Sequence, residues 1–494
     1  MNQPTLFAGC EPEVAAGVDG RILAVGEAAR SAAGRRARVV RLHGRAWPGL
    51  IDSHIHLEGL ADQHLTLDLT GTSSLDETLA RISSWSKPLP GGAWVIGAGW
   101  YNDAWPDPAF PNSAQLDKAA GGRPAYLRRK DGHSAWVSSA ALHLAHIEPG
   151  RQGKPTGILR ETAAQPVADL VPLPDDATFD DAMARALGDL AAVGLTGVHS
   201  MDSARGFGSW QRLRAQGRLP IRVTYNLPAA DLPHAVRIGV RSGWGDEWLR
   251  IWGVKAFLDG SLGSRTAEML DGSGIARLTQ PNLVELVEQC ARAELNVCLH
   301  AIGDGAVRRA LDALAPHREA WQRWRPRIEH AQCVNPKDVR RFARIGVIAS
   351  MQPIHAVADR ELVDQYWPKV AASSYAWNAL ASAGARLAFG SDAPVETADP
   401  LVGIEAATVW RRKARWHPEL AVSRAAALRA YTSGAAYAVG MERDLGSLRP
   451  GKLCDMTVVD EGLVVATVVG GQVSFLRKPL AASRRSSSKP RRRP

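Results

Sequence analysis

The sequence contains few cysteines, and their spacing gives them no obvious common role. Five cysteines are spread over 494 residues, at positions 10, 290, 298, 333 and 454. Their number is odd and no two of them form a CxxC pair, which argues against a disulfide framework and against a zinc site built from thiolates. We expect the cysteines to be reduced and structural.

Long apolar runs and a targeting segment are also missing. No stretch approaches the ~20 uninterrupted apolar residues that a membrane span requires. The start of the chain, MNQPTLFAGC, has neither the basic region nor the long apolar run of a signal peptide. These absences predict a cytoplasmic protein that does not enter a membrane.

Acidic residues are absent from residues 477–494, where eight Lys and Arg residues gather. The whole chain has a net charge of +10, so the rest of the chain carries only +2. This segment is rich in Ser, Arg and Pro, and nothing aromatic or groove-reading accompanies it. We therefore predict a disordered basic tail over 477–494 and no specific nucleic-acid partner.

Apolar runs alternate with helical periodicity through most of the chain. Runs such as GLTGVHS, IWGVKAFL and LNVCLHAIG are typical of strand ends, and stretches such as DAMARALGDLAAVG are typical of helices. About eight βα units predict an α/β fold, a closed (β/α)₈ TIM-like barrel over residues 49–65 and 164–438. Short β-like segments in 1–48 and 439–476 predict one small β-sandwich lobe built from both termini.

Residues 66–163 break the repeating pattern and are rich in Gly, Pro, Trp and Asn. They predict a small α+β subdomain, inserted after the first barrel strand and near the active-site mouth. Its Trp and Tyr side chains are expected to pack its own core. The alternative is that Trp100, Asn102, Asp131 and His133 line a pocket above the barrel mouth.

Two histidines follow the apolar run GLID directly. His54 and His56 are two residues apart, and alternation along a strand places such residues on one face. At the carboxyl end of a barrel strand, both imidazoles can face a shared metal. An HxH pair alone is a weak signal, because it also arises by chance.

Four further strand ends carry residues suited to a hydrolytic metal site, in the order Lys255, His300, His330 and Asp392. Each has an ordinary structural explanation when taken singly. Either histidine can be a core residue, and the lysine can form a surface salt bridge. The complete set is much more specific than any member of it.

These residues lie in motifs that closely resemble the amidohydrolase superfamily, and within it amidohydrolase family 3, the N-substituted formamide deformylase-like metal-dependent hydrolases. The resemblance covers residues from about 48 to 460 and rests on GLIDSHIHL, RKDGHSAWVSSAAL, PTGILRE, VKAFLDGSLGSRT, LHAIGDGAV, RIEHAQ, ASMQPIH, GSDAPVE and GSLRPGKLCDMTVVD. It implies a hydrolase that cleaves a non-peptide C–N bond, of the amide or N-substituted formamide class, in a small molecule. The natural substrate does not follow from the resemblance.

The resemblance also implies a role for each residue of the set. His54 and His56 would hold the more buried metal, His300 and His330 the second, and Asp392 would lie beside the bridging water as ligand and general base. Lys255 matches a position that can carry a carboxylated lysine bridging two metals. An ammonium group has no lone pair for a metal, whereas a carbamate offers two oxygens.

The implied cofactor is one or two divalent metal ions per chain. A bound cation lowers the pKa of water toward ~7 and polarises the scissile carbonyl. Imidazole and carboxylate ligands favour zinc, and manganese, iron and nickel remain alternatives. If only one metal binds, we expect Lys255 to stay unmodified and to face a carboxylate such as Asp259.

Weaker signals surround this set. His355 follows the predicted seventh strand and is either a substrate-binding residue at the barrel mouth or an ordinary loop histidine. Arg265 either clamps a substrate carboxylate or carbonyl or pairs with Asp259. Asn102 and His133, from the insert, are also candidates for contact with the substrate. His199 is expected to be a buried, hydrogen-bonded histidine.

Two other functional hypotheses remain open on the same scaffold. A cyclic amidohydrolase or deaminase would use the same metals on a ring C–N bond. A catalytically idle regulatory relative would keep only the fold, although it would not need the complete set of residues. A homodimer is a reasonable expectation for this architecture.

Overall fold

Eight parallel strands form the central sheet of the computed structural model, which describes residues 3–130, 134–148, 156–319 and 324–478. Neighbours in this sheet follow the order of the chain, with β18 at one end and β6 at the other. Its strands are β6 (Leu50–Ile55), β12 (Leu195–Ser200), β13 (Arg222–Pro228), β14 (Leu249–Phe257), β15 (Asn296–Ala301), β16 (Arg327–His330), β17 (Ile348–Met351) and β18 (Arg386–Phe389). All of the pairings between them are parallel.

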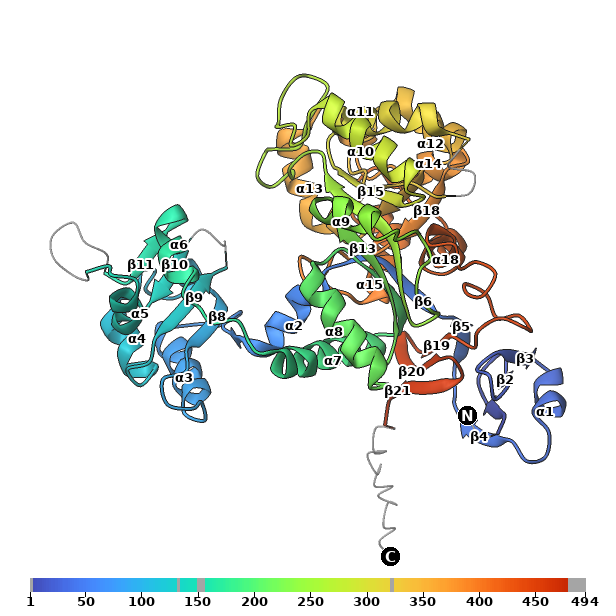
Figure 1. Ribbon diagram of the computed structural model, residues 1–494, viewed down its shortest axis with the longest axis horizontal. Helices are drawn as coiled ribbons and strands as arrows, with labels where there is room; N and C mark the ends of the chain where they lie inside the picture. The colour runs from blue at the N-terminus through green and yellow to red at the C-terminus, as the bar shows by residue number, and fades with distance from the viewer. Residues whose placement is uncertain (1–2, 131–133, 149–155, 320–323, 479–494) are drawn as a thin grey trace, which may run out of the picture. The chain divides into compact units, whose positions relative to one another are not determined.

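The sheet closes where the segment after β18 meets β6. The Asp392 backbone N–H donates to the His54 carbonyl at 2.7 Å, and the His56 N–H donates to the Ala393 carbonyl at 2.8 Å. Several helices surround this barrel and alternate with its strands along the chain (Figure 1). They include α8 (Ala204–Ala215), α10 (Gln280–Arg292), α11 (Asp304–Leu314), α12 (Pro336–Ile345) and α13 (His355–Tyr366). The predicted (β/α)₈ barrel is confirmed.

Both ends of the chain contribute to a pair of four-stranded sheets. The first contains β1 (Thr5–Ala8), β2 (Val14–Ala16), β3 (Ile22–Val25) and β4 (Arg38–Arg41). The second contains β5 (Arg45–Pro48), β19 (Met456–Asp460), β20 (Leu463–Val469) and β21 (Gln472–Leu476). Figure 1 shows β5, in blue, beside the red C-terminal strands, because β5 pairs antiparallel with β19. Side chains of both sheets, among them Phe7, Ile22, Met456 and Val465, share one core.

The inserted region forms a separate compact unit over Leu57–Ala186, which is wider than the predicted 66–163. The composition marks where the βα pattern stops, whereas the unit also takes in α2 (Leu57–Leu65), which contacts β7. Its five-stranded sheet has the order β11-β10-β9-β8-β7. These strands are β7 (Leu67–Asp68), β8 (Val95–Trp100), β9 (Ala125–Arg129), β10 (Ser134–Val137) and β11 (Ile158–Arg160), accompanied by α3 (Leu75–Ser86), α4 (Ser113–Ala119) and α5 (Ser139–Leu144).

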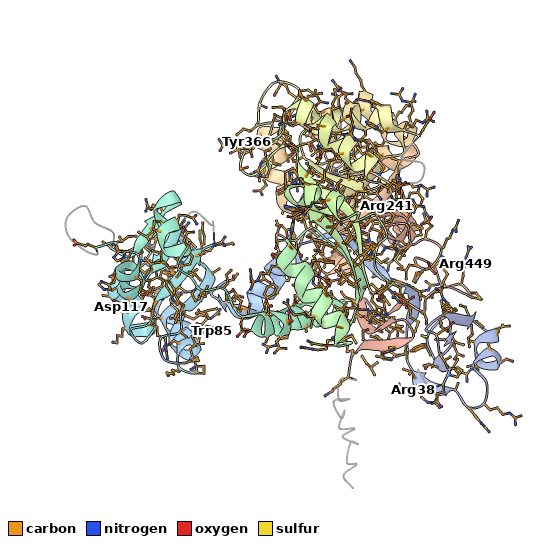
Figure 2. All side chains as sticks on the ribbon, in the orientation of Figure 1. Arg38, Trp85, Asp117, Arg241, Tyr366 and Arg449 are labelled. Atoms are coloured by element: carbon orange, nitrogen blue, oxygen red, sulfur yellow. The ribbon has the colours of Figure 1, made fainter. Side chains whose placement is uncertain are left out.

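The insert's aromatic side chains pack its own core, as expected. The rings of Trp100 and Trp136 are both fully buried, with centroids 6.0 Å apart. Trp85, labelled in Figure 2, packs partly buried against the same cluster. In the part of the chain that the structure describes, no helix is long and apolar enough to cross a membrane.

Candidate metal centre

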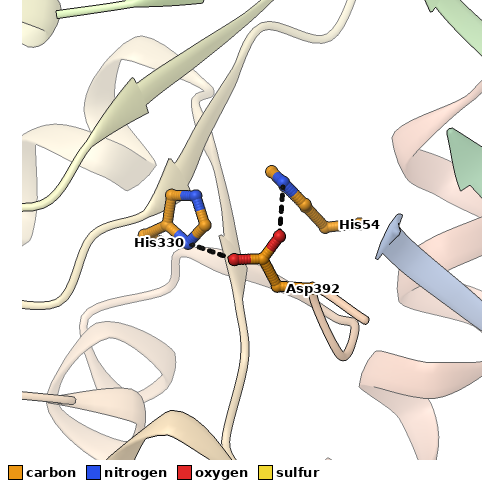
Figure 3. Close-up of side chains that lie close together, drawn as sticks. All are labelled: His54, His330 and Asp392. Carbon is orange, nitrogen blue, oxygen red and sulfur yellow. Dashed lines mark ion pairs between the residues drawn. The ribbon is translucent and has the colours of Figure 1, made fainter. Parts of the chain in front are cut away.

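The carboxyl ends of the barrel strands bring together residues that are far apart in the sequence. His54, His330 and Asp392 lie so close that one ligand atom from each falls within 4.8 Å of the others. Figure 3 shows the Asp392 carboxylate between the two imidazoles. All three residues are buried, so the group faces the interior of the barrel mouth rather than bulk solvent.

The remaining members of the predicted set surround this group. His56 Nε2 lies 3.2 Å from Asp392 Oδ1, and Lys255 Nζ lies 3.3 Å from His54 Nε2. The ring centroid of His300 is 4.6 Å from that of His330. The structure therefore gathers all six predicted residues at one site.

Hydrogen bonds determine which imidazole nitrogen keeps a lone pair. His54 Nδ1 lies 2.7 Å from the Glu329 carboxylate, and His330 Nδ1 lies 2.8 Å from Gln352 Oε1. Both of these partners are acceptors, so both Nδ1 atoms carry the hydrogen and both Nε2 atoms keep the lone pair.

His300 has the opposite arrangement. Its Nε2 lies 3.0 Å from the Gly260 carbonyl oxygen and must donate to it. The buried Nδ1 is then an acceptor, and it has no hydrogen-bond partner among the described residues. A buried imidazole nitrogen with an unpaired lone pair is expected of a metal ligand when no metal is bound. The donor set therefore fits a divalent cation.

Burial keeps these imidazoles in the neutral form that binds metals. It lowers the pKa of His54 to about 4 and that of His300 to about 3, and the positive charge of Lys255 acts in the same direction. Burial also holds the pKa of His330 well below its ordinary value.

Two other groups keep their charged forms. Burial alone would lower the pKa of His56, but hydrogen bonds to Asp202 and Asp392 raise it to about 9. Burial alone would raise the pKa of Asp392, but the neighbouring imidazoles hold it well below its usual range. Asp392 is therefore a carboxylate at the centre of the site, and His56 would have to release its proton in order to bind a metal.

Lys255 faces the histidines. It is 3% exposed, and burial lowers its pKa. Asp259, the partner considered for an unmodified lysine, instead accepts the backbone N–H groups of Ile302, Gly303 and Glu268 at 2.8 to 3.0 Å. No ion pair between Lys255 and Asp259 exists among the described residues, so the alternative with Lys255 turned toward Asp259 is not what the structure shows.

The backbone at the site is strained at two of the residues that meet there. His330 has a φ of 71° and Asp392 a φ of 61°, in the left-handed region that side chains other than glycine rarely occupy. Such a residue costs about 1–3 kcal/mol unless its surroundings hold it in place. Figure 3 shows the side chains of both residues pointing toward one another.

A buried network below the site was not predicted from the sequence. Both nitrogens Nε and Nη2 of Arg327 lie within 3.0 Å of the Glu329 carboxylate, which in turn holds His54. Arg327 Nη1 also lies 3.0 Å from Nδ1 of His199, which is buried and hydrogen-bonded as expected. In the four-residue strand RIEH, Arg327 and Glu329 alternate with Ile328 and His330. Two charges on one face of a buried strand were the signal that could have revealed the network.

The residues assigned to substrate binding lie in different places. His355 Nε2 is 3.7 Å from Asp392 Oδ2, so it belongs to the site. Arg265 donates to the hydroxyl of Tyr366 at 2.7 Å, at the end of α13 (Figure 2), and not to Asp259. Asn102 is buried in the insert, where its side chain bonds to Arg129 at 3.0 Å and to the Pro108 carbonyl at 2.6 Å. Asp131 and His133 lie outside the described residues.

A closed parallel barrel, with the neutral imidazoles of His54, His300 and His330 and the Asp392 carboxylate gathered at the carboxyl ends of its strands, defines the class of barrel hydrolases that carry a metal. Comparison with known proteins identifies the family. Residues 38–475 match the model of the amidohydrolase family, and the chain belongs to it. The predicted resemblance is thereby confirmed.

Relatives and solved structures agree with this assignment. The chain is 32% identical to Protein LONG AFTER FAR-RED 3 of Arabidopsis thaliana, with 92% of this chain and 87% of the relative covered. It is 27% identical to the N-substituted formamide deformylase of Arthrobacter pascens, with 89% and 88% covered. A crystal structure of an uncharacterized metal-dependent hydrolase from Pyrococcus furiosus superimposes with a TM-score of 0.76 at 29% identity, covering 93% of this chain and 98% of that one.

Proposed function

We propose that this protein hydrolyses a non-peptide C–N bond, of the amide or N-substituted formamide class, in a small molecule. The observation that carries the proposal is the buried group of His54, His330 and Asp392, in which hydrogen bonds leave a lone pair on each imidazole. The similarity to a formamide deformylase supports the choice of bond.

His54, His56, His300, His330 and Asp392 would hold one or two divalent ions, with zinc the best match to their donor atoms. When bound, the cation supplies an acidified water and polarises the carbonyl of the substrate. Asp392 accepts the proton of the attacking water and later returns it to the departing nitrogen, since amide hydrolysis needs a base first and an acid afterwards. Glu329 and Gln352 hold the His54 and His330 rings in the required tautomer.

The test combines metal analysis of the purified protein with a hydrolysis screen. We expect one or two equivalents of divalent metal per chain, together with amine release from an N-alkylformamide such as N-butylformamide. The screen also contains N-acetylated amines, cyclic amides and aminopurines, because ring opening or ammonia release would support the cyclic amidohydrolase or deaminase alternative. Full metal occupancy without turnover of any class would support the regulatory alternative and contradict the proposal.

Lys255 decides how many metals the site holds, and we propose that it is carboxylated. Its Nζ lies 3.3 Å from the lone-pair nitrogen of His54, so an unmodified ammonium would occupy space that a ligand oxygen can use. An ammonium group next to two bound cations would be repelled by roughly several kcal/mol in a buried site, whereas a carbamate would be attracted to them. Metal with bicarbonate should reactivate the metal-stripped enzyme better than metal alone. Equal recovery without a carbon dioxide source, at one metal per chain, would show that Lys255 is unmodified.

A further inference from the structure

His355, the first residue of α13, points a buried ring nitrogen without a partner at the site. The residue is 7% exposed, and its Nε2 is buried without a hydrogen-bond partner among the described residues. This Nε2 lies 3.7 Å from Asp392 Oδ2, which is too far for a hydrogen bond. A buried polar atom left unpaired costs about 1–3 kcal/mol, so its retention calls for an explanation.

The surroundings of His355 indicate that Nε2 carries a hydrogen. On the other side of the ring, Nδ1 lies 3.2 Å from the amide nitrogen of Gln332, which can only donate. Nδ1 is then the acceptor, and Nε2 is an N–H. The carboxylate of Asp392 on that side favours the same arrangement, since a lone pair facing it would be repelled. Nε2–H is therefore an oriented donor with nothing to donate to.

We propose that His355 is a catalytic residue that donates its Nε2–H to the carbonyl oxygen of the substrate. The inference rests on the proposed function and adds a second group to the chemistry assigned to Asp392. A water held at Asp392 attacks a carbonyl carbon from about 3 Å, which brings the carbonyl oxygen within reach of a donor 3.7 Å from the same carboxylate. As the water adds, the C=O electron pair moves onto this oxygen, and the hydrogen bond to the resulting oxyanion strengthens.

Gln332 is the positioning residue in this arrangement. The backbone carbonyl of Gln332 accepts the Tyr375 N–H at 2.6 Å, and the residue is 3% exposed, so the fixed backbone and the close packing keep its side chain beside His355. The His355 ring also lies parallel to that of His330, with centroids 6.0 Å apart. These contacts prevent the ring from turning away from the site.

Two substitutions separate donation from packing. His355→Gln can place an amide N–H close to the position of Nε2, whereas His355→Asn can replace only the Nδ1 side and leaves no donor toward Asp392. For the amide that the screen identifies, His355→Asn should lower kcat by about 10²–10³-fold with little change in KM, the usual loss for one oxyanion donor. His355→Gln should recover at least about tenfold of that loss. The exposed His234→Asn serves as the control and should match wild type.

Binding of methylphosphonate, whose tetrahedral oxygens resemble the oxyanion, provides a readout without turnover. Calorimetry on the metal-loaded proteins should show weaker binding to His355→Asn than to His355→Gln, at equal metal content and melting temperature. Equal losses in both variants, loss of metal, or unchanged kcat and binding in His355→Asn would overturn the inference. If wild type hydrolyses no amide but binds the phosphonate through His355, the inferred donor stands and the proposed substrate class fails. If wild type does neither, both fail.

Discussion

The carboxylate of Asp392 lies among four imidazoles, two beside each oxygen. Oδ1 lies 3.5 Å from His54 and 3.2 Å from His56, and Oδ2 lies 4.0 Å from His330 and 3.7 Å from His355. Most of these separations exceed a hydrogen bond, which leaves room for a ligand atom or a water between the groups. Asp392 is thus placed to act on a water and not only to pair with its neighbours.

Asp392→Asn tests this role, because the amide keeps the shape of the side chain and cannot take a proton. We expect kcat to fall by at least about 10²-fold, the usual scale for a lost general acid or base. Metal content, measured by elemental analysis, should stay at the wild-type value. The control is Asp460→Asn, which changes a partly exposed carboxylate at the end of β19, outside the site. Loss of metal from a folded Asp392→Asn protein would show that the residue is chiefly a ligand.

Glu329→Gln tests the network that holds His54. The charge of Glu329 keeps the hydrogen on His54 Nδ1 and neutralises Arg327, which is fully buried. Metal affinity, measured by competition with a chelating dye, should fall by about 10–100-fold, the usual loss for a partner of a ligand. The exposed Glu288→Gln is the matched control. Unchanged affinity at unchanged melting temperature would exclude a positioning role for Glu329.

The residues of the site could be predicted from the sequence, but the residues that support them could not. Strand alternation and position at strand ends selected His54, His56 and the later histidines as candidates, because those rules depend on local pattern, and the family resemblance supplied their roles. Gln352, directly after the next strand β17, bonds to His330, and such a partnership depends on the register between strands, which no local pattern contains. Arg265 shows the same limit, because its partner Tyr366 comes from a distant helix.

At the scale of elements, the closure of the barrel depends on a close approach between the segment after β18 and β6. A Cβ on Gly390 would lie 2.5 Å from the His54 nitrogen and 2.6 Å from Asp52 Oδ1. The same Asp52 oxygen accepts the backbone N–H groups of His54 and Ser391, at 2.9 and 3.1 Å. The junction that closes the barrel therefore also places His54 and the segment that leads to Asp392.

Gly390→Ala should disturb stability and the metal centre together. The added methyl group has no space, so the two segments must separate, at a typical cost of about 1–3 kcal/mol for an overpacked site. We expect a lower melting temperature and weaker metal binding. Gly188→Ala is the control, since a Cβ there meets nothing within 4 Å. A stable Gly390→Ala protein with wild-type metal affinity would show that the junction is more tolerant than the geometry indicates.

At the scale of the whole molecule, repetition made the barrel predictable, because each βα unit shows the same alternation of apolar runs and helical periodicity. The lobe built from both termini was also predictable from its β-like ends. The extent of the insert was not, because its unit begins with a helix, α2, whose pattern looks like any other helix of the barrel. The boundary depends on which residues contact one another in the folded chain, and composition does not predict those contacts.

A buried ion pair helps to join the terminal sheets to the barrel. Arg222, in barrel strand β13, donates from Nε and Nη2 to the two oxygens of Asp455, at 2.7 and 2.9 Å, just before β19. Both side chains are no more than 5% exposed, and Asp455 also accepts the Gly470 N–H at 2.8 Å. Removing one partner would leave a buried charge without compensation.

Asp455→Ala should therefore lower the free energy of unfolding by about 3–5 kcal/mol, the usual cost of breaking a buried pair. The double variant Arg222→Met with Asp455→Leu should recover most of this loss, because it removes both charges and keeps the volume filled. Urea denaturation followed by tryptophan fluorescence provides the measurement. Glu405→Ala, in an exposed pair with Lys413, should stay within about 1 kcal/mol of wild type. If Asp455→Ala were as mild as this control, the ion pair would contribute nothing to joining the terminal sheets and the barrel. The apolar contacts and the hydrogen bonds of Thr457 and Thr467 to Gly194 and Ala191 would then join them.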